Sequence, residues 1–156
     1  MTLFESRKMR YFNPIDHDFY LEPKLNISFD RVNNRFLISD YGCKTVDEIK
    51  PGIYVWTVTD DKENIIPLYF GLFGQRAKNP TLRNRFKQHY SGLRSSLKGK
   101  PPTAHWRDCL FPETMCFLEK YKKIDIYFGH FEKKEIDNLE TSLIQKFDTP
   151  WNKAKK

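Results

Sequence analysis

Three stretches in the last two thirds of the chain carry the residue pattern of β-strands. Residues 52–60 (GIYVWTVTD) and 65–73 (IIPLYFGLF) are rich in β-branched and aromatic side chains, and the polar stretch DKEN separates them. Two such runs around a short polar loop predict an antiparallel hairpin. Residues 123–131 (KIDIYFGHF) predict a third strand.

The register of this hairpin determines which side chains share a face of the sheet. A four-residue loop would pair Asp60 with Ile65 and therefore Trp56 with Tyr69. Because side chains alternate along a strand, Tyr54 and Tyr69 would then lie on the same face. Tyrosine is also a common strand residue, so this arrangement alone does not define a functional site.

A helix is predicted to begin with Asn79 as its N-cap and Pro80 in its first turn, and to run to about Tyr90. At about 100° per residue, Arg85 and His89 lie together on one flank of this helix. Because the helix directly follows a strand rich in aromatics, we expect these cations to lie beside the tyrosine face. The apolar stripe of the helix consists of Leu82, Phe86 and Leu93.

A second amphipathic helix is predicted over residues 133–147, and an acidic residue stands on its apolar side. Glu140 falls inside the apolar stripe when the residues are projected at about 100° each. A buried carboxylate is costly unless a cation or a metal ion compensates it. Two interpretations are open here: a buried ion pair with an arginine such as Arg85, or a functional carboxylate. The apolar positions are Ile136, Leu139, Leu143, Ile144 and Phe147.

The first part of the chain predicts an extension rather than a separate domain. Residues 25–40 (LNISFDRVNNRFLISD) alternate well enough to form a hairpin that turns at Asn33 and Asn34, two residues that tolerate positive φ. A chain of 156 residues is long enough for one domain with its own core. We therefore expect residues 1–50 to pack as an extension on a core domain of residues 51–156.

The formal net charge of +7 is unevenly distributed along the chain. Residues 1–50 carry eight basic and eight acidic side chains, so the whole excess lies in the remainder. A segment without acidic residues is either an ordinary solvated face or a phosphate-binding surface whose affinity falls steeply with salt. Between Asn64 and Arg107 there is no Asp or Glu, and the basic residues there are Arg76, Lys78, Arg83, Arg85, Lys87, Arg94, Lys98, Lys100 and Arg107.

Composition excludes several classes of protein. No run approaches the ~18 consecutive apolar residues of a membrane span, and the N-terminus lacks the apolar stretch of a signal peptide. A cytoplasmic protein with no membrane partner is therefore expected. Cys43, Cys109 and Cys116 are odd in number and not spaced as zinc ligands, which predicts reduced thiols.

Five short motifs follow one another through the predicted elements. GIY occupies residues 52–54, YFG residues 69–71, LRNRFKQH residues 82–89, LETSLIQKF residues 139–147 and TPWN residues 149–152. In this order, and in a strand, strand, helix, strand, helix setting, they resemble the defining elements of the GIY-YIG nuclease superfamily. A lone GIY carries little information, whereas five ordered elements are a specific signal.

The resemblance covers about residues 51–153 and implies a fold class and an activity. Members of this superfamily are small α/β (α+β) modules in which an antiparallel three-stranded sheet is flanked by helices. They hydrolyse phosphodiester bonds in DNA with one divalent metal ion, here Mg²⁺ or Mn²⁺. The expected protein is a stand-alone endonuclease with double-stranded DNA as its partner. Cleavage of both strands would need a homodimer or higher oligomer that supplies two sites.

The resemblance also implies roles for individual residues. Tyr54 and Tyr69 would be the active-site phenols, and Arg85 the cation that stabilises the transition state. His89 would transfer a proton or orient a phosphate, and Glu140 would bind the metal ion. Which tyrosine activates the attacking water as general base stays open.

Further positions would support this site. Asn152 would tether the C-terminal segment to it, and Gly52 and Gly71 would allow backbone and substrate to approach closely. Leu72 stands where the family often has a polar or basic residue, so a basic residue of the long loop 72–81 would replace that cation. The expected DNA-binding residues are Arg76, Lys78, Arg83, Lys87, Arg94, Lys98 and Lys100.

The chemistry of these residue types agrees with the resemblance. Phosphodiester hydrolysis needs an activated water and neutralisation of developing negative charge. An arginine keeps its charge, and one carboxylate with waters and a phosphate oxygen suffices for Mg²⁺. Two other hypotheses stay open. One is a non-catalytic nucleic-acid-binding module that retains the fold, and the other is a structural protein in which Glu140 and Arg85 form a buried ion pair.

Overall fold

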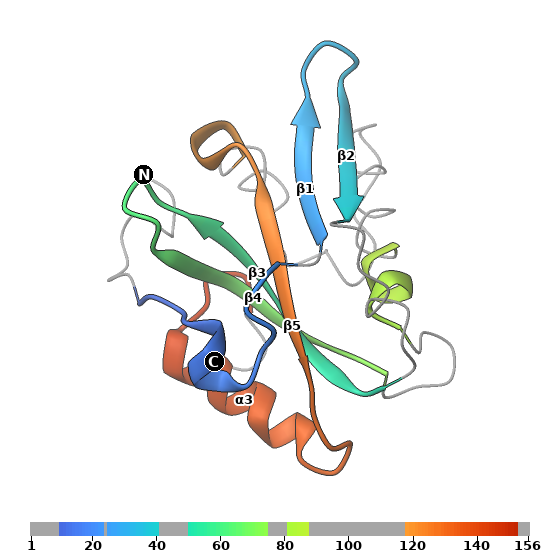
Figure 1. The fold of residues 1–156 in the computed structure, drawn as a ribbon, viewed down its shortest axis with the longest axis vertical. Helices are drawn as coiled ribbons and strands as arrows, with labels where there is room; N and C mark the ends of the chain where they lie inside the picture. The colour runs from blue at the N-terminus through green and yellow to red at the C-terminus, as the bar shows by residue number, and fades with distance from the viewer. Residues whose placement is uncertain (1–9, 24, 41–49, 75–80, 88–117, 153–156) are drawn as a thin grey trace.

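The computed structural model describes residues 10–23, 25–40, 50–74, 81–87 and 118–152 (Figure 1). Its elements are the 3-10 helix η1 (Pro14–His17), strands β1 (Leu25–Asp30), β2 (Arg35–Asp40), β3 (Gly52–Thr59), β4 (Ile65–Phe73) and β5 (Ile124–His130), and helix α3 (Ile136–Phe147). Residues 82–87 and 118–121 are also helical. No helix in these ranges has the length and hydropathy needed to cross a bilayer.

The strands form a single antiparallel sheet in the order β2-β1-β5-β3-β4, so the fold is α+β. The predicted three-stranded sheet is present as β5-β3-β4, but the full sheet has five strands, and the prediction is wrong in that respect. The expected hairpin of β1 and β2 supplies the other two. Leu25 pairs with Ile126 and Ile27 with Ile124, and all four side chains are buried. The hairpin therefore joins the sheet because its apolar residues cover the edge of β5.

The β3–β4 hairpin differs in register from the prediction near its turn. Thr59, not Asp60, faces Ile65. The register then shifts between Trp56 and Thr57, so that Trp56 faces Tyr69 as predicted. The two halves of the hairpin thus differ by one residue, and an irregularity in the ladder corrects the difference before the tyrosines are reached.

The turn and a proline explain this shift. The Asp60 N–H donates to the Asn64 carbonyl at 3.0 Å, and Glu63 between them has φ of 64°. The turn is therefore closed by Asn64, so that residues 61–63 lie between the bonded pair and not the predicted residues 61–64. Pro67 has no N–H and lies in β4, the edge strand, next to the shift. Prolines within sheets occur at edges and bulges for this reason.

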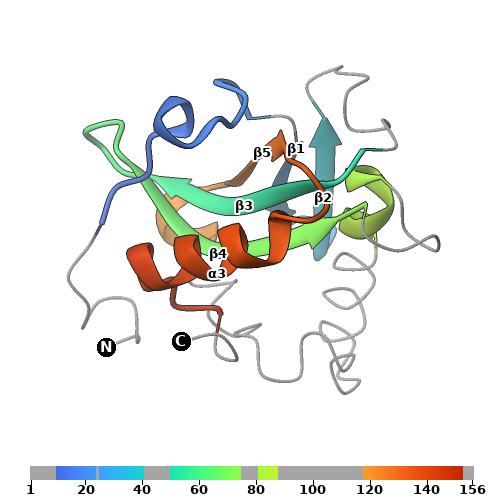
Figure 2. The same cartoon turned by 90° about the horizontal axis from the view of Figure 1, so that it is seen from below.

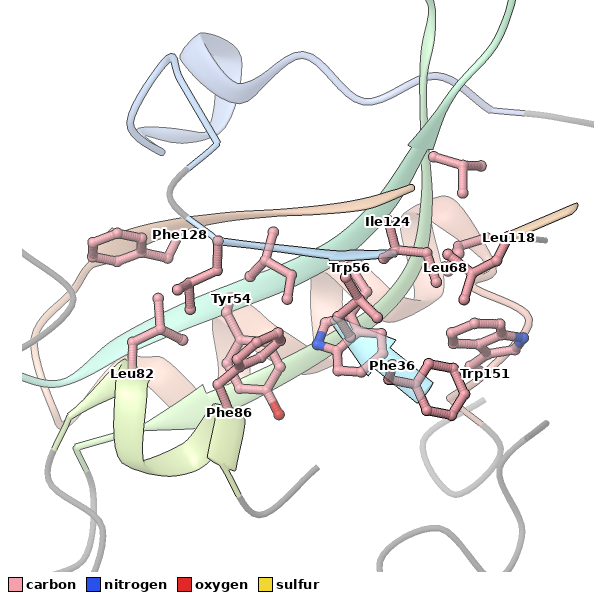
Figure 3. Close-up of a cluster of buried hydrophobic side chains, with 14 of the residues drawn as sticks. Phe36, Tyr54, Trp56, Leu68, Leu82, Phe86, Leu118, Ile124, Phe128 and Trp151 are labelled. Atoms are coloured by element: carbon pink, nitrogen blue, oxygen red, sulfur yellow. The ribbon is translucent and has the colours of Figure 1, made fainter. Parts of the chain in front are cut away.

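The two faces of the sheet carry separate hydrophobic cores. The first core contains Tyr54, Trp56 and Phe128 from the sheet, Phe36 from the N-terminal hairpin, and Trp151 (Figure 3). The second core combines inward-facing strand residues with α3 and with the segment before β1. Its buried members are Phe12, Phe19, Ile53, Val55, Phe70, Tyr127, Ile136, Leu143, Ile144 and Phe147.

The helix after β4 begins at residue 82, later than the predicted Asn79–Pro80 start. The Thr81 side chain accepts the Asn84 N–H at 3.1 Å, which is the bond of an N-cap residue to its third helical position. Leu82 and Phe86 are buried in the first core, as the apolar stripe predicted. The predicted helix end at Tyr90 and the third stripe position, Leu93, lie outside the described residues.

Helix α3 confirms the prediction of a carboxylate on an apolar stripe. It begins at Ile136 rather than at residue 133, because residues 133–135 form a turn. Glu140 is only 5% exposed. Figure 2 shows α3 running alongside β4, which is its main neighbour in the sheet.

The C-terminal segment closes the outer edge of β4. The side-chain oxygen of Asn152 accepts the Phe70 N–H at 2.8 Å, and its side-chain nitrogen donates to the Phe70 carbonyl at 2.9 Å. The Trp151 N–H donates to the Leu68 carbonyl at 3.0 Å, and the Thr149 hydroxyl donates to the Asn152 oxygen at 2.6 Å. The segment thus satisfies backbone groups that an edge strand would otherwise leave exposed.

We expect Asn152→Ala to lower the free energy of unfolding by roughly 2–4 kcal/mol, because both backbone groups of Phe70 would lose buried partners. Urea unfolding followed by circular dichroism measures this change. Asn138→Ala, at an exposed position of α3, is the matched control and should change stability little. Equal stabilities of the two variants would contradict a tethering role for Asn152.

Candidate active site

Tyr54 lies at the centre of the candidate site and is only 1% exposed. It faces Gly71 across the β3–β4 ladder. A Cβ atom at Gly71 would lie 2.2 Å from both Cζ and the hydroxyl oxygen of Tyr54. The tyrosine ring therefore occupies the space that any other residue at position 71 would fill.

Tyr69 lies beside Tyr54 on the same face of the sheet, as the sequence predicted. The two ring centroids are 6.1 Å apart, and the phenols are hydrogen bonded to each other. Tyr69 is less buried than Tyr54 and packs against the margin of the first core. The pair thus has one enclosed and one partly exposed tyrosine.

Two charged side chains act on the Tyr54 hydroxyl. Burial raises the pKa of Tyr54 to about 12, while the positive charge of Arg85 and its hydrogen bond to the hydroxyl oppose that rise. The negative charge of Glu140 raises this pKa further, and the hydrogen bond with Tyr69 lowers it. Tyr54, Tyr69, Arg85 and Glu140 therefore form one interacting group, in which a cation and a carboxylate act in opposite directions on the pKa of a neutral phenol.

Four elements contribute to this group. Tyr54 comes from β3 and Tyr69 from β4, while Arg85 comes from the helix of residues 82–87, whose Leu82 and Phe86 anchor it on the first core (Figure 3). Glu140 comes from α3, which packs on the other layer. Helix α3 lies along the edge strand β4, and the negative charge of its Glu140 carboxylate acts on the Tyr54 hydroxyl.

Both glycines of the motifs make room for side chains inside the protein. A Cβ atom at Gly52 would lie 2.1 Å from Cζ of Phe73 and 2.5 Å from the Gly129 carbonyl oxygen. Gly71 makes the corresponding space for Tyr54. At both glycines, the close approach is therefore between the glycine backbone and other atoms of the protein itself.

The other predicted site residues are divided between described and undescribed parts of the chain. Arg83 is half-buried and Lys87 is exposed, both on the helix that carries Arg85. Asn152 contacts the backbone between Tyr69 and Gly71 rather than the charged group. The remaining predicted residues, His89, Arg76, Lys78, Arg94, Lys98 and Lys100, lie outside the described residues.

Two features of the site have no signal in the local sequence. Thr81 caps the helix that holds Arg85, whereas the Asn-Pro pair before it is the stronger cap pattern. Trp151 packs its ring 6.2 Å from that of Trp56 and bonds β4 through its N–H. The TPWN motif indicated that this segment belongs to the site, but it predicted no role for Trp151.

Comparison with known proteins adds no assignment: no protein-family model matches the chain, and no curated protein or solved structure is significantly similar to it. A functional interpretation therefore depends on the geometry of the site and on the motifs.

Replacing Tyr54 by Phe should remove a phenol that titrates near pH 12. Because this pKa is raised above the ordinary value of about 10, the unfolded chain loses the proton first. The stabilising contribution of the neutral phenol is complete below pH 10 and is lost as the pH rises through about 12. The free energy of unfolding should consequently fall more steeply with pH in the wild type than in Tyr54→Phe.

Ultraviolet difference titration of tyrosinate absorbance, with Tyr11→Phe as a control for an exposed tyrosine, measures the pKa directly. If the titration step that disappears in Tyr54→Phe lies near the ordinary tyrosine pKa of about 10, the enclosed geometry of this hydroxyl is contradicted.

Proposed function

We propose that this protein is a metal-dependent DNA endonuclease of the GIY-YIG type. The observation that carries the proposal is the interaction of two buried side chains, Tyr54 and Glu140, with the partly buried Tyr69 and Arg85 as one group. These are four of the positions that the motif resemblance selects, and they come from four separate elements. A fold with no use for them would more readily fill such a position with apolar side chains.

The group contains what phosphodiester hydrolysis requires. Arg85 is a permanent cation placed to neutralise the charge that develops on the phosphate oxygens. Tyr54 is protonated at neutral pH and holds Tyr69 and Arg85 in place through hydrogen bonds. Tyr69 is the more exposed of the two residues, so it is better placed to meet the attacking water and accept its proton.

The donor chemistry of Glu140 fits a hard divalent cation. Its carboxylate is buried and acts on the Tyr54 hydroxyl. The described residues contain no cluster of three or more metal-binding side chains, and Mg²⁺ typically takes one or two carboxylates together with waters and substrate phosphate. Glu140 would hold Mg²⁺ or Mn²⁺, and the bound ion would supply a Lewis acid and an acidic water.

The DNA backbone would bind along the basic side of the helix that carries Arg85. Arg83 and Lys87 lie on this helix, and the segment without acidic residues continues on both sides of it. His89, four residues after Arg85, would orient the phosphate or transfer a proton. Binding should weaken steeply with salt, since each neutralised phosphate releases counterions. A dimer would supply the second site for double-strand cleavage.

Glu140→Gln should lower the rate of plasmid nicking at least about 100-fold, because the neutral amide is a poor ligand for the metal ion. Supercoiled plasmid is incubated with each protein in Mg²⁺, in Mn²⁺ and in EDTA. Asp137→Asn, an exposed change on the same helix, is the matched control and should nick at the wild-type rate. EDTA should abolish all nicking.

Three other results would reject the proposal. Glu140→Gln that nicks as fast as the wild type would remove Glu140 from the reaction. A second result is that neither the wild type nor the variant nicks DNA, while both bind it equally and in a salt-sensitive way, with a library that contains all short sites as substrate. This result would favour a non-catalytic binding module. Lowered stability of Glu140→Gln with no DNA binding by either protein would favour a structural ion pair between Glu140 and Arg85.

Gly71→Ala should lower the cleavage rate at least about 100-fold, because its methyl group must displace the Tyr54 hydroxyl and displacements of this size have such effects on catalysis. DNA affinity should change much less, since position 71 is buried. Single-turnover cleavage and fluorescence anisotropy measure the two effects separately. A parallel loss of affinity and rate would show that Gly71 acts through the fold rather than through the site.

A further inference from the structure

The β1–β2 hairpin extends beyond the strand that it joins. Leu25, Asn26 and Ile27 pair with β5, whereas β1 and β2 continue as a two-stranded ribbon to Asp30 and Arg35. Figure 1 shows this ribbon rising past the end of the sheet. Its far end is the four-residue turn of residues 31–34.

The turn has a defined conformation because one carboxylate organises it. Asp30 accepts the Val32 N–H at 3.1 Å, the Asn33 N–H at 3.3 Å and the Asn33 side-chain nitrogen at 2.7 Å. Arg35 lies 3.6 Å from the same carboxylate. These contacts, first among them the Asn33 side-chain bond, hold the pKa of Asp30 below its usual value. Asn34 completes the turn with φ of 50°.

All four side chains of the turn point into solvent. Val32 is 93% exposed, so it contributes nothing to the core. Arg31, Asn33 and Asn34 are exposed around it. The tip therefore offers hydrogen-bonding groups from an arginine and two amides together with one apolar side chain, Val32.

Basic residues of the turn before β5 extend this surface. Arg31 is 3.2 Å from Glu119, which links the hairpin tip to that turn. Lys120, Lys122 and Lys123 are exposed there, and Lys123 lies 3.9 Å from Asp125. Basic side chains outnumber acidic ones around the hairpin tip. The basic residues are Arg31, Arg35, Lys120, Lys122 and Lys123, and the acidic residues are Asp30, Glu119 and Asp125.

The shape and chemistry of the ribbon match the major groove of duplex DNA. Two strands about 4.8 Å apart, with their side chains, fit a groove about 12 Å wide and not the minor groove of about 6 Å. Arginine and asparagine bond the base edges of guanine and adenine, and apolar side chains contact the thymine methyl group. The positive excess favours the approach of phosphates on either side.

We propose that the tip of the β1–β2 hairpin, residues 31–34, enters the major groove of DNA and sets the sequence preference of the protein. The inference depends on the proposed function, because it takes duplex DNA as the ligand. Strand register places the start of the tip about eight residues beyond Tyr54, or roughly 30 Å with the two lateral steps between strands. The tip would therefore read bases within about nine base pairs of the cleaved phosphate.

The test compares a tip variant with a variant of the other hairpin. The tip variant combines Arg31→Ala, Val32→Ala and Asn34→Gly, which leaves the Asp30–Asn33 bonds and supplies glycine at the positive φ. Lys62→Ala, in the exposed turn between β3 and β4, is the control, because each protein loses one positive charge. Both are made in the Glu140→Gln background, so that DNA stays intact during selection from a random duplex library.

The parent protein should enrich a sequence motif, and the tip variant should lose at least about 10-fold in the ratio of its affinities for the enriched and a scrambled duplex. The control should keep both motif and ratio. A tip variant that enriches the parent motif with an unchanged ratio would overturn the proposal, and so would a parent that enriches no motif. Circular dichroism and thermal melting confirm that the variants are folded.

The design separates this inference from the proposed function. Selection reports binding without cleavage, whereas metal-dependent nicking by the wild type reports the nuclease. Enrichment without nicking would reject the nuclease and retain the hairpin as a DNA-reading element. If the wild type nicks DNA but the tip variant keeps the parent's sequence preference, the nuclease is retained and the DNA-reading role of the hairpin is rejected.

Discussion

The enclosure of the Tyr54 hydroxyl opposite Gly71 is the constraint on which the site depends. A phenol can be buried at this point because position 71 has no side chain, and it needs hydrogen-bonding partners because water is excluded. Tyr69 and Arg85 supply them. The positive charge of Arg85 lowers the pKa of this phenol, and the buried carboxylate of Glu140, on α3, raises it. One missing side chain thus determines how four polar ones are arranged.

The sequence predicted those features that arise from local pattern. Runs of β-branched and aromatic residues predicted the core hairpin, and alternation predicted the N-terminal one. The 3.6-residue period identified Glu140 as anomalous, and the pairing of Trp56 with Tyr69 correctly placed Tyr54 beside Tyr69. Features that depend on distant contacts were predicted only in outline: the first part of the chain as an extension packed on the core, and Asn152, through the resemblance, as a tether to the site. The addition of the N-terminal hairpin to β5 and the bonds of Asn152 to Phe70 join segments far apart in the chain, which no periodicity encodes.

Errors at the ends of elements have a different origin. The early closure of the β3–β4 turn and the capping of the helix by Thr81 each involve a choice between neighbouring residues of similar propensity. Such choices depend on how the flanking residues pack, here Ile65 against the second core and Leu82 within the first. The site was nevertheless predictable in outline, because its side chains lie in the middle of strands and helices and not at their ends.

The attachment of Asn152 to β4 has a consequence for how the protein is made. Eighty-two positions separate Asn152 from Phe70, so during synthesis the outer edge of β4 emerges long before the segment that covers it. Until then the strand presents unpaired N–H and C=O groups that can form hydrogen bonds with the exposed strand of another chain. Early termination of translation before residue 149 would leave a sheet that is open at this edge. Quality control in the cell would therefore meet truncated chains as aggregation-prone species rather than as weakened versions of the complete protein.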